Sequence, residues 1–304
     1  MVNHKNILLV ISGPTAVGKS DLCIKLAKKF NTSIISSDSR QFFKEMNIGT
    51  SKPSEEELAK VPHFFINSLS IFEGYDVRKF ETDVINMLNW LFKMRRMVIM
   101  TGGSGLYIDA VTKGLDEIPA VEEVVREELN VLYRQEGIGV LQQKLSALDP
   151  EYYEKVDLQN PQRLIRALEV TIGTGKPYSS YRLEKRASRP FSVIKIGLER
   201  DREELYQRVN ERMDAMIEMG LFEEAASLFH LRHLNALQTV GYKEIFDYMA
   251  GKYDKEEAIR LLKRNSRRYA KRQLTWLRRD GEYTWFRPDE EDIITSFIVD
   301  QMAE

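Results

Sequence analysis

The 304-residue chain has only one cysteine, Cys23, and contains no long apolar run. A single cysteine can neither form a disulfide within the chain nor build a cysteine-rich zinc site. No apolar stretch approaches the ~20 residues that cross a bilayer, and the apolar run 7–11 is too short for the core of a signal peptide. We therefore expect a cytoplasmic protein without a membrane anchor.

Neither sign of charge is in excess, because 45 Lys and Arg residues face 46 Asp and Glu residues, for a net charge of −1. Composition alone thus gives no sign of a nucleic-acid-binding protein, whose binding domain is usually basic. The charges are nevertheless uneven, since the segment 263–279 has eight basic residues and no acidic one. Such a helix favours binding to a phosphate backbone. The alternative is a structural helix whose arginines pair with acids elsewhere in the fold.

Two motifs of nucleotide hydrolases are also missing. The chain has no N-K-x-D sequence, the motif that recognises guanine. Neither strand-like segment, 33–36 or 97–100, ends in the four apolar residues and aspartate that are expected of a hydrolase metal site. An ATP hydrolase or a GTPase switch is therefore disfavoured.

The sequence does contain a complete phosphate-binding motif. Residues 13–20 read GPTAVGKS, the G-x-x-x-x-G-K-[ST] pattern, directly after the apolar run 7–11. Its glycines allow backbone N–H groups to surround phosphate oxygens, and the dipole of the following helix favours negative charge. Lys19 would contact the terminal phosphates and the Ser20 hydroxyl would bind Mg²⁺. The predicted diphosphate or nucleotide site comprises Gly13, Pro14, Thr15, Ala16, Val17, Gly18, Lys19 and Ser20.

Hydrophobic periodicity predicts an α/β fold. Strand-like segments alternate with helical patterns in the first 116 residues and return once later, at 7–11, 33–36, 64–69, 97–100 and 192–198. This alternation is typical of a P-loop nucleoside-triphosphate-hydrolase-like parallel sheet with helices on both faces. Residues 117–190 show only helical patterns, which indicates an inserted all-helical domain. We expect a core of residues 1–116 and 191–304, with basic helices near its C-terminus.

Two further segments follow predicted strands. Asp38 lies just beyond 33–36, where ligands bind in open parallel sheets. It could act as a general base, bind a metal, or cap its own turn, since Asp-Ser is ordinary turn chemistry. The glycine turn 102–105 follows 97–100 at the same predicted edge of the sheet, although a glycine turn alone is weak evidence of a ligand site.

Two pairs of arginines are spaced by about one helical turn. Arg163 and Arg166 are three residues apart, and Arg208 and Arg212 are four apart. A solvated helix face explains such a pair without any function. In a phosphate-binding enzyme the same pairs are candidate clamps on phosphate charge.

Together these segments closely resemble the tRNA dimethylallyltransferase (tRNA isopentenyltransferase) family. Besides the phosphate loop, the matching motifs are SSDSRQ at 36–41, IGTSKP at 48–53, GGSGLY at 102–107, QRLIRALE at 162–169, TGKP at 174–177, GYKE at 241–244 and YAKRQLTW at 269–276. They follow the family's order over roughly residues 6–280. Phe43 and Ser104 replace the family's usual tyrosine and threonine, but they keep a ring and a hydroxyl.

The resemblance implies transfer of a dimethylallyl group from dimethylallyl diphosphate to N6 of adenosine 37 in tRNA, giving N6-isopentenyladenosine and diphosphate. The phosphate loop would hold the diphosphate leaving group, with Mg²⁺ on Ser20. Asp38 would accept a proton from the adenine amine, and Ser104 would orient Asp38 or the adenine. Lys19, with Arg208 or Arg212, would neutralise the diphosphate.

The resemblance and the basic segment also predict how the anticodon stem-loop of tRNA is bound by a monomeric enzyme. The expected contacts are Asp38, Ser39, Arg40, Gln41, Ser104, Arg126, Gln162, Arg163, Leu164, Ile165, Arg166, Arg267, Arg268, Lys271 and Arg272. Two rival functions explain less of the sequence. A P-loop small-molecule kinase leaves the segment 263–279 unexplained. An RNA-binding regulator that senses a nucleotide leaves Asp38 and the second glycine turn without a role.

Overall fold

The computed structural model describes residues 5–183 and 186–303 and divides into two compact units. The larger unit consists of Met1–Thr112 and Ser188–Glu304, and the smaller of Lys113–Ala187. The smaller unit thus begins at 113, where the sequence suggested 117, and ends at 187, where it suggested 190. The Ala187 N–H donates to the Lys113 carbonyl at 2.7 Å, so the two ends of the smaller unit are joined at its base.

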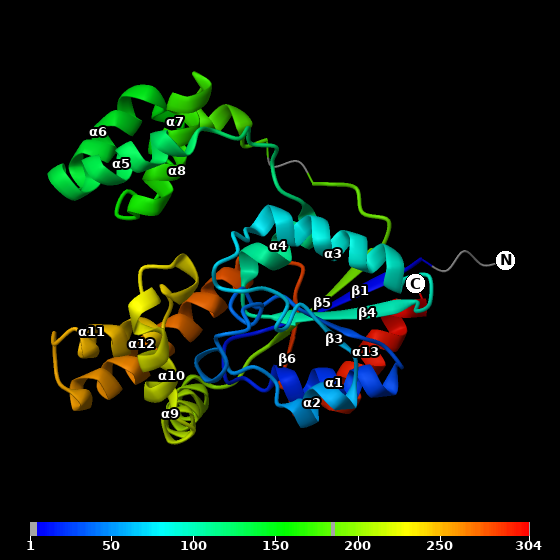
Figure 1. The fold of residues 1–304 in the computed structure, drawn as a ribbon. Coiled ribbons are helices and arrows are strands. Elements are labelled where there is room, and N and C mark those ends of the chain that lie inside the picture. The colour runs from blue at the N-terminus through cyan, green and yellow to red at the C-terminus, as the bar shows by residue number, and fades with distance from the viewer. Residues whose placement is uncertain (1–4, 184–185, 304) are drawn as a thin grey trace. The chain divides into compact units, whose positions relative to one another are not determined.

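A sheet whose neighbouring strands all run parallel forms the centre of the larger unit (Figure 1). In the described residues it has six strands in the order β3-β2-β4-β1-β5-β6: β1 Ile7–Ser12, β2 Ile34–Ser36, β3 His63–Phe64, β4 Met97–Gly102, β5 Ser192–Leu198 and β6 Thr284–Phe286. The predicted P-loop-like parallel fold is confirmed. The prediction extended β3 too far and missed β6, because strands of two and three residues leave no apolar period to detect.

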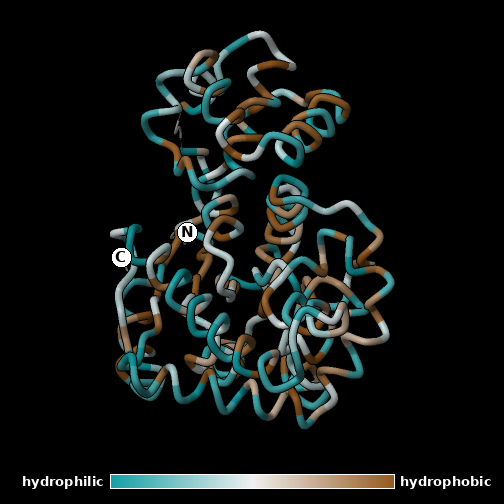
Figure 2. Tube along the Cα trace, turned by 90° about the vertical axis from the view of Figure 1, so that its left-hand side faces the viewer, coloured by the Kyte–Doolittle hydropathy of each residue, from teal (hydrophilic) through white to brown (hydrophobic). Residues whose placement is uncertain are grey.

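Helices cover both faces of this sheet (Figure 1). The first face packs against α1 Lys19–Lys29 and α13 Glu291–Ala303, and the second against α3 Val77–Leu91 and α4 Gly105–Lys113. All six residues of β1 are buried, as expected for a strand covered on both sides. Figure 2 shows the hydrophobic stretches running through the interior of the unit, with hydrophilic stretches outside.

A third cluster of helices extends the larger unit beyond the sheet. It consists of α9 Arg202–Glu218, α10 Leu221–Leu228, α11 Tyr242–Met249 and α12 Lys255–Arg278, whose apolar sides share one core. The α12 stripe of buried positions follows helical spacing: Ala258, Leu262, Ser266, Ala270, Gln273 and Leu277. The short helix α2 Glu55–Lys60 and the 3₁₀ turns Ile48–Thr50, Phe229–Leu231 and Asn235–Leu237 complete the described elements of this unit.

The described part of the smaller unit contains helices and no strand. Its helices are α5 Glu123–Glu136, α6 Ile138–Leu148, α7 Pro150–Tyr153 and α8 Pro161–Thr174, followed by the 3₁₀ turn Tyr178–Tyr181. The Asn160 side chain caps α8 by accepting the Arg163 N–H, and Gly175 ends the helix in a left-handed conformation. These residues set where α8 begins and ends, and the spacing of its apolar residues sets which face is buried.

A buried ion pair joins β5 to the turn before β6. The Lys195 ammonium, whose side chain is 2% exposed, lies 2.7 Å from Asp280 Oδ2 and 2.8 Å from Glu282 Oε2. Its Nζ also lies 5.5 Å from the centre of the Tyr283 ring. The ion pair therefore attaches the C-terminal segment to the sheet.

We predict that Lys195→Met lowers the free energy of unfolding by about 3–5 kcal/mol, because it breaks an ion pair whose side chains are only 2% and 11% exposed. Urea unfolding followed by circular dichroism measures this. The matched control is Lys25→Met, which removes the exposed ion pair between α1 and Glu291 and should have little effect. Similar losses in both variants would contradict the role given to Lys195.

Candidate active site

Three turns leave the sheet at one edge because their strands are neighbours in register. Ser36 of β2 pairs with Thr101 of β4, and Ser12 of β1 pairs with Gly102. The phosphate loop, the Asp38 turn and the Gly102–Gly103 turn therefore start side by side. Gly102 has to be glycine here, since a Cβ would lie 2.3 Å from Ser37 Oγ and 2.8 Å from its backbone.

A cavity of about 590 Å³ lies at this edge of the sheet. Its walls come from the phosphate loop, the loop 38–53, the glycine turn after β4, α9, the turn before α11, and α12. The candidate residues that line it are Thr15, Ala16, Gly18, Lys19, Ser20, Asp38, Arg40, Gln41, Arg208 and Arg212. The sequence assigned these residues to two ligands, and the fold brings them to one cavity.

The backbone of the phosphate loop is held by cations that bind its carbonyl groups. Lys19 Nζ donates to Gly13 O at 3.0 Å and to Pro14 O at 2.8 Å, and Arg208 Nε donates to Ala16 O at 2.9 Å. Ala16 and Gly18 have φ angles of 64° and 111°, in the left-handed region. Side chains from outside the loop thus stabilise a backbone shape that alanine adopts at a cost.

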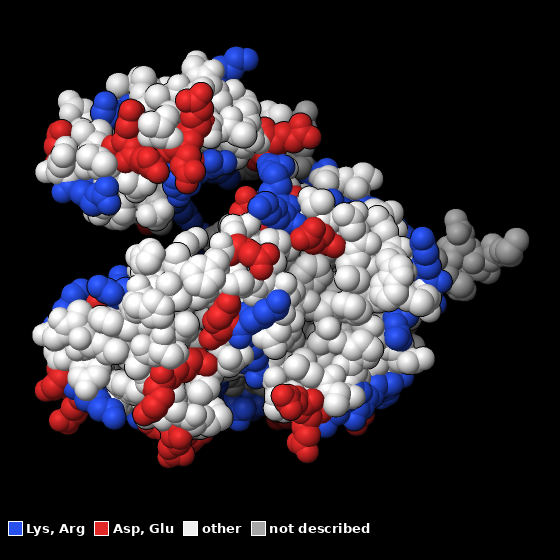
Figure 3. Space-filling view, viewed as in Figure 1, with Lys and Arg blue, Asp and Glu red and all other residues white. Residues whose placement is uncertain are grey.

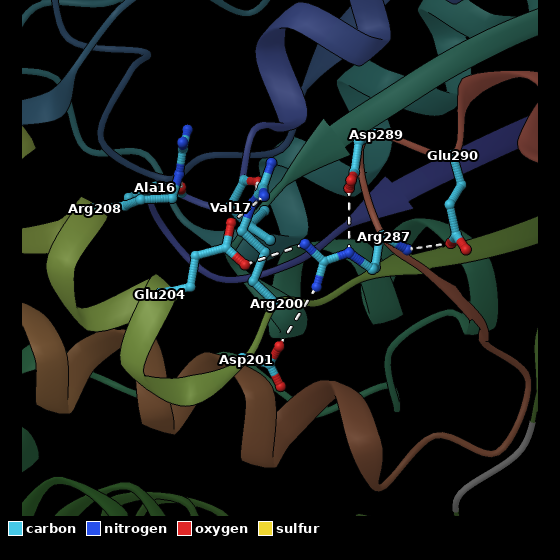
Figure 4. A network of polar contacts seen from close by, with 9 residues as sticks. All are labelled: Ala16, Val17, Arg200, Asp201, Glu204, Arg208, Arg287, Asp289 and Glu290. Atoms are coloured by element: carbon cyan, nitrogen blue, oxygen red, sulfur yellow. Dashed lines mark hydrogen bonds and ion pairs between the residues drawn. The ribbon is translucent and has the colours of Figure 1, made fainter.

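Arg200 is a second external support of the loop, and the sequence analysis missed it. Its Nε donates to Val17 O at 2.9 Å, and its guanidinium also pairs with Glu204 (Figure 4). Glu204 in turn binds Arg287, which lies 3.4 Å from Asp289. The only signal in the sequence was its position two residues after β5, at the same edge of the sheet as the phosphate loop.

Positive charge is concentrated in this cavity. The pKa of the Lys19 ammonium is lowered to about 8, first by burial and then by the nearby Arg212 cation, while the Asp38 carboxylate acts in the opposite direction. Burial also lowers the pKa of Arg212, against the attraction of Asp38. Arg212 Nε donates to Ser51 Oγ at 2.7 Å. Two buried cations with one nearby carboxylate favour the binding of an anion.

Asp38 forms its own turn and lines the cavity as well. Its Oδ1 accepts the Arg40 N–H at 3.0 Å, the hydrogen bond that the capping interpretation requires. The Asp38 side chain still faces the cavity close enough to affect Lys19 and Arg212. Ser104 contacts Ser39, whose N–H lies 3.2 Å and whose Oγ lies 3.3 Å from Ser104 Oγ, so it supports the Asp38 turn through its neighbour.

The loop 47–53, which includes the IGTSKP motif, is held by Glu224 of α10. The Glu224 carboxylate accepts the N–H groups of Asn47, Ile48 and Gly49 at 2.8–3.0 Å, and the Tyr242 hydroxyl at 2.6 Å. The Tyr242 ring leaves no room at position 49, where a Cβ would lie 2.4 Å from it. Next to this loop, Gln41 Nε2 donates to Thr50 O and Ser51 O.

Helix α12 forms another wall of the cavity through residues that the sequence analysis did not select. Gln273 accepts the Thr15 N–H at 2.9 Å and donates to Gly103 O at 3.1 Å, which ties the phosphate loop to the glycine turn. Tyr269 also lines the cavity, and burial raises its pKa to about 12, so it stays protonated at neutral pH. The detectable signal was a polar residue, Gln273, within the buried stripe of an amphipathic helix.

Part of the positive charge on α12 is neutralised by acidic residues elsewhere in the fold. Lys263 pairs with Asp214 at 2.6 Å and Arg278 with Glu199 at 2.7 Å, while Arg267 donates to Asn210. Among the described residues, none forms an ion pair with three exposed side chains: Arg268, Lys271 and Arg272. These three remain available for an external anion.

The smaller unit corrects two of the predicted tRNA contacts. Leu164 and Ile165 are 0% and 1% exposed and pack in the core of this unit, so their side chains cannot bind RNA. Gln162 and Arg163 are exposed on the other side of α8. Arg126 and Arg166 are both partly exposed, and both pair with the buried carboxylate of Glu169.

The cavity also suits Mg²⁺, although the described residues contain no cluster of three or more His, Cys, Asp or Glu that could hold a metal alone. Mg²⁺ is usually bound through one or two protein oxygens together with phosphate oxygens and water. Ser20 and Asp38 bring a hydroxyl and a carboxylate to the same cavity. In the parts of the chain that the structure describes, no helix is long and apolar enough to span a membrane.

Comparisons with known proteins agree with the resemblance. The model of the IPP transferase family matches residues 41–280. The tRNA dimethylallyltransferase of Christiangramia forsetii is 54% identical over 285 residues, covering 94% of each chain. The tRNA dimethylallyltransferase 1 of Bacteroides fragilis is 49% identical over 291 residues, which are 96% of this chain and 97% of the relative.

Two solved structures share the fold. The full-length tRNA isopentenylpyrophosphate transferase of Bacillus halodurans is 38% identical with a TM-score of 0.72, covering 98% of this chain and 97% of that one. A eukaryotic dimethylallyltransferase acting on tRNA is 28% identical with a TM-score of 0.78, covering 93% of this chain and 74% of that one. With a family model over most of its length and relatives about half identical from end to end, the chain belongs to the IPP transferase family, that of the tRNA dimethylallyltransferases.

Proposed function

We propose that this protein transfers a dimethylallyl group from dimethylallyl diphosphate to N6 of adenosine 37 in tRNA, releasing diphosphate. The observation that carries the proposal is one cavity lined by both the phosphate loop and Asp38. A loop for the diphosphate and a carboxylate for the amine are the two groups that this substitution needs. We also propose that the enzyme acts as a monomer in the cytoplasm, where its tRNA substrate is found.

In the proposed reaction, the adenine N6 attacks the allylic carbon while the bond from that carbon to the diphosphate oxygen breaks. N6 becomes positively charged as it forms the new bond, and Asp38 accepts one of its protons. The Asp38 side chain is oriented for this role by the hydrogen bond from the Arg40 N–H to its Oδ1. Because an aromatic amine is a poor nucleophile, a positioned base contributes about 10²–10⁴-fold to the rate.

Positive charge at the phosphate loop stabilises the departing diphosphate. Lys19 and Arg212 line the cavity at the loop, and Arg208 supports the loop through Ala16 O. Ser20, with phosphate oxygens, would hold Mg²⁺ there, and the ion would supply additional neutralisation of the leaving group. When the substrate binds, the Lys19 ammonium exchanges its bonds to Gly13 O and Pro14 O for bonds to phosphate oxygens.

The adenine has to leave its stack in the anticodon loop to reach this cavity, at a cost of a few kcal/mol. Exposed cations on α12 and on the smaller unit would hold the RNA backbone and offset that cost. A single experiment tests the transfer reaction: undermodified tRNA is incubated with radiolabelled dimethylallyl diphosphate, and with labelled ATP as a control donor. Label that enters RNA from the prenyl donor alone supports the transferase. Label transferred from ATP would support a kinase, and no transfer from either donor a binding protein.

We predict that Asp38→Asn lowers the single-turnover rate by about 10²–10⁴-fold while the dissociation constants of tRNA and donor stay nearly unchanged. Asparagine keeps an acceptor for the Arg40 N–H, so the turn is retained and only the base is lost. Rapid-quench measurement of prenyl transfer gives the rate. An unchanged rate would leave Asp38 with its turn-forming role alone.

We predict that affinity for dimethylallyl diphosphate falls as the pH rises through about 8, because the Lys19 pKa in the free protein is about 8 and a bound anion raises it. Below that pH Lys19 is charged in both states and contributes no pH dependence. Calorimetric titration without tRNA from about pH 7 to about pH 9.5 measures the effect, with up to one proton taken up per donor bound above the free pKa.

Lys19→Met provides the control for this pH dependence. Burial lowers the pKa of Lys52, in the same cavity, to about 8 as well. Lys52 Nζ is, however, bound to Phe43 O and to the side chain of Asn67. If the pH dependence persists in Lys19→Met, Lys19 is not its source.

We predict that replacing Arg268, Lys271 and Arg272 by glutamine weakens tRNA binding and reduces the slope of log affinity against log salt by about 0.7–0.9 per lost phosphate contact. Binding of the donor without tRNA should stay the same. The matched control is Lys263→Gln with Arg278→Gln, on the same helix, whose charges are already paired. Equal changes of slope in both variants would contradict the assignment.

A further inference from the structure

A buried carboxylate in the smaller unit serves two arginines. Glu169 of α8 has a side chain that is only 3% exposed. Arg166, one turn earlier on the same helix, donates from Nη1 to Glu169 Oε1. Arg126 of α5 brings its Nη1 to 3.5 Å from Oε1 and 3.4 Å from Oε2. Two helices are thus joined through one acid.

The arginines themselves are only partly covered. The side chains of Arg126 and Arg166 are 46% and 42% exposed, so each guanidinium meets the acid on one side and solvent on another. One negative charge faces two positive charges, which leaves a net positive charge at the surface. Exposed Arg163 lies one turn before Arg166 on α8 and adds to it.

This positive group is unusual for its surroundings. The exposed residues of α5 around Arg126 include the acids Glu123, Glu127 and Glu128. Figure 3 shows acidic side chains gathered on the viewed face of the helical unit. A surface of this kind repels RNA in general, so binding of a phosphate here depends on where the arginines are held.

A contribution to stability is a weak explanation for the burial of the Glu169 carboxylate. Within the described residues, Glu169 Oε2 has no hydrogen-bond partner. Removing a carboxylate from water is costly, and apolar residues of similar size replace many buried ion pairs without loss of stability. An apolar residue at position 169 could not, however, hold the planar guanidinium groups of two arginines in one fixed orientation.

We propose that Glu169 is a positioning residue that orients Arg126 and Arg166 as a preformed site for a phosphate group of the RNA backbone. A fixed pair of guanidinium groups binds phosphate with less loss of side-chain entropy than two free arginines. The inference rests on the proposed function, because it takes tRNA as the substrate. It adds that the acid, despite its negative charge, strengthens RNA binding.

The inference is tested by whether loss of the Glu169 charge weakens or strengthens RNA binding. In the full-length protein, Glu169→Gln removes one negative charge and keeps the shape of the side chain. Simple charge counting predicts tighter RNA binding, whereas loss of orientation predicts a KM for tRNA about tenfold higher with kcat and the KM of the donor unchanged. Glu127→Gln, an equal charge change at an exposed acid beside Arg126, should leave the KM for tRNA the same or slightly lower.

Each outcome decides the inference. An unchanged or lower KM for tRNA in Glu169→Gln overturns the inference. The inference is also overturned if Glu169→Gln raises that KM by the same factor when it is added to Arg126→Met with Arg166→Met, since no arginines then remain to be oriented. If Glu169→Gln does not fold, Arg126→Lys with Arg166→Lys keeps the charge but loses the forks, and unchanged tRNA binding there overturns the inference. Failure of the wild-type protein to transfer the prenyl group would overturn the proposed function itself.

Discussion

The burial of the Lys19 charge is the constraint on which the rest of the site depends. The ammonium of Lys19, the first residue of α1, loses hydration inside the phosphate loop, and several groups compensate for that loss. The Gly13 and Pro14 carbonyls accept hydrogen bonds from it, and Asp38 lies close enough to raise its pKa. Those carbonyls lie in a loop whose other backbone groups form hydrogen bonds with Arg200, Arg208 and Gln273. The loop therefore has its shape without an anion, and in the proposed reaction a diphosphate would replace contacts that already exist.

Much of the fold and part of the site could be predicted from the sequence, namely those features that depend on residues close together in the chain. The phosphate loop, the alternating strands and the position of Asp38 follow from residues next to one another in the chain. Arg200 and Gln273 could not be found in this way, because their partners Val17 and Thr15 lie far away in the sequence. The burial of the Leu164 and Ile165 side chains within a predicted contact segment has a different cause. A family motif assigns one function to a continuous stretch, whereas on a helix the residues three or four positions apart turn into the core.

Two family motifs that looked independent share one structural role. The IGTSKP motif at 48–53 and the GYKE motif at 241–244 meet at Glu224, which accepts N–H groups from the first and the Tyr242 hydroxyl from the second. Gly49 allows the tyrosine ring to approach, and Ser51 then faces Arg212. The two motifs thus place the loop that carries Ser51 beside an arginine of the cavity, and residues of both also line that cavity.

The hydrogen bond between Ala187 and Lys113 has a consequence for how such a chain can change over generations. Because the smaller unit leaves and rejoins the chain at a single closed point, residues added to it or removed from it do not alter the register of any strand. The entropy of closing a loop grows only slowly with its length, so insertions there cost the sheet little. The smaller unit can therefore vary in size and surface among relatives while the chemistry at the strand ends is kept. A single enzyme architecture can in this way acquire a different surface by changing only the segment between residues 113 and 187.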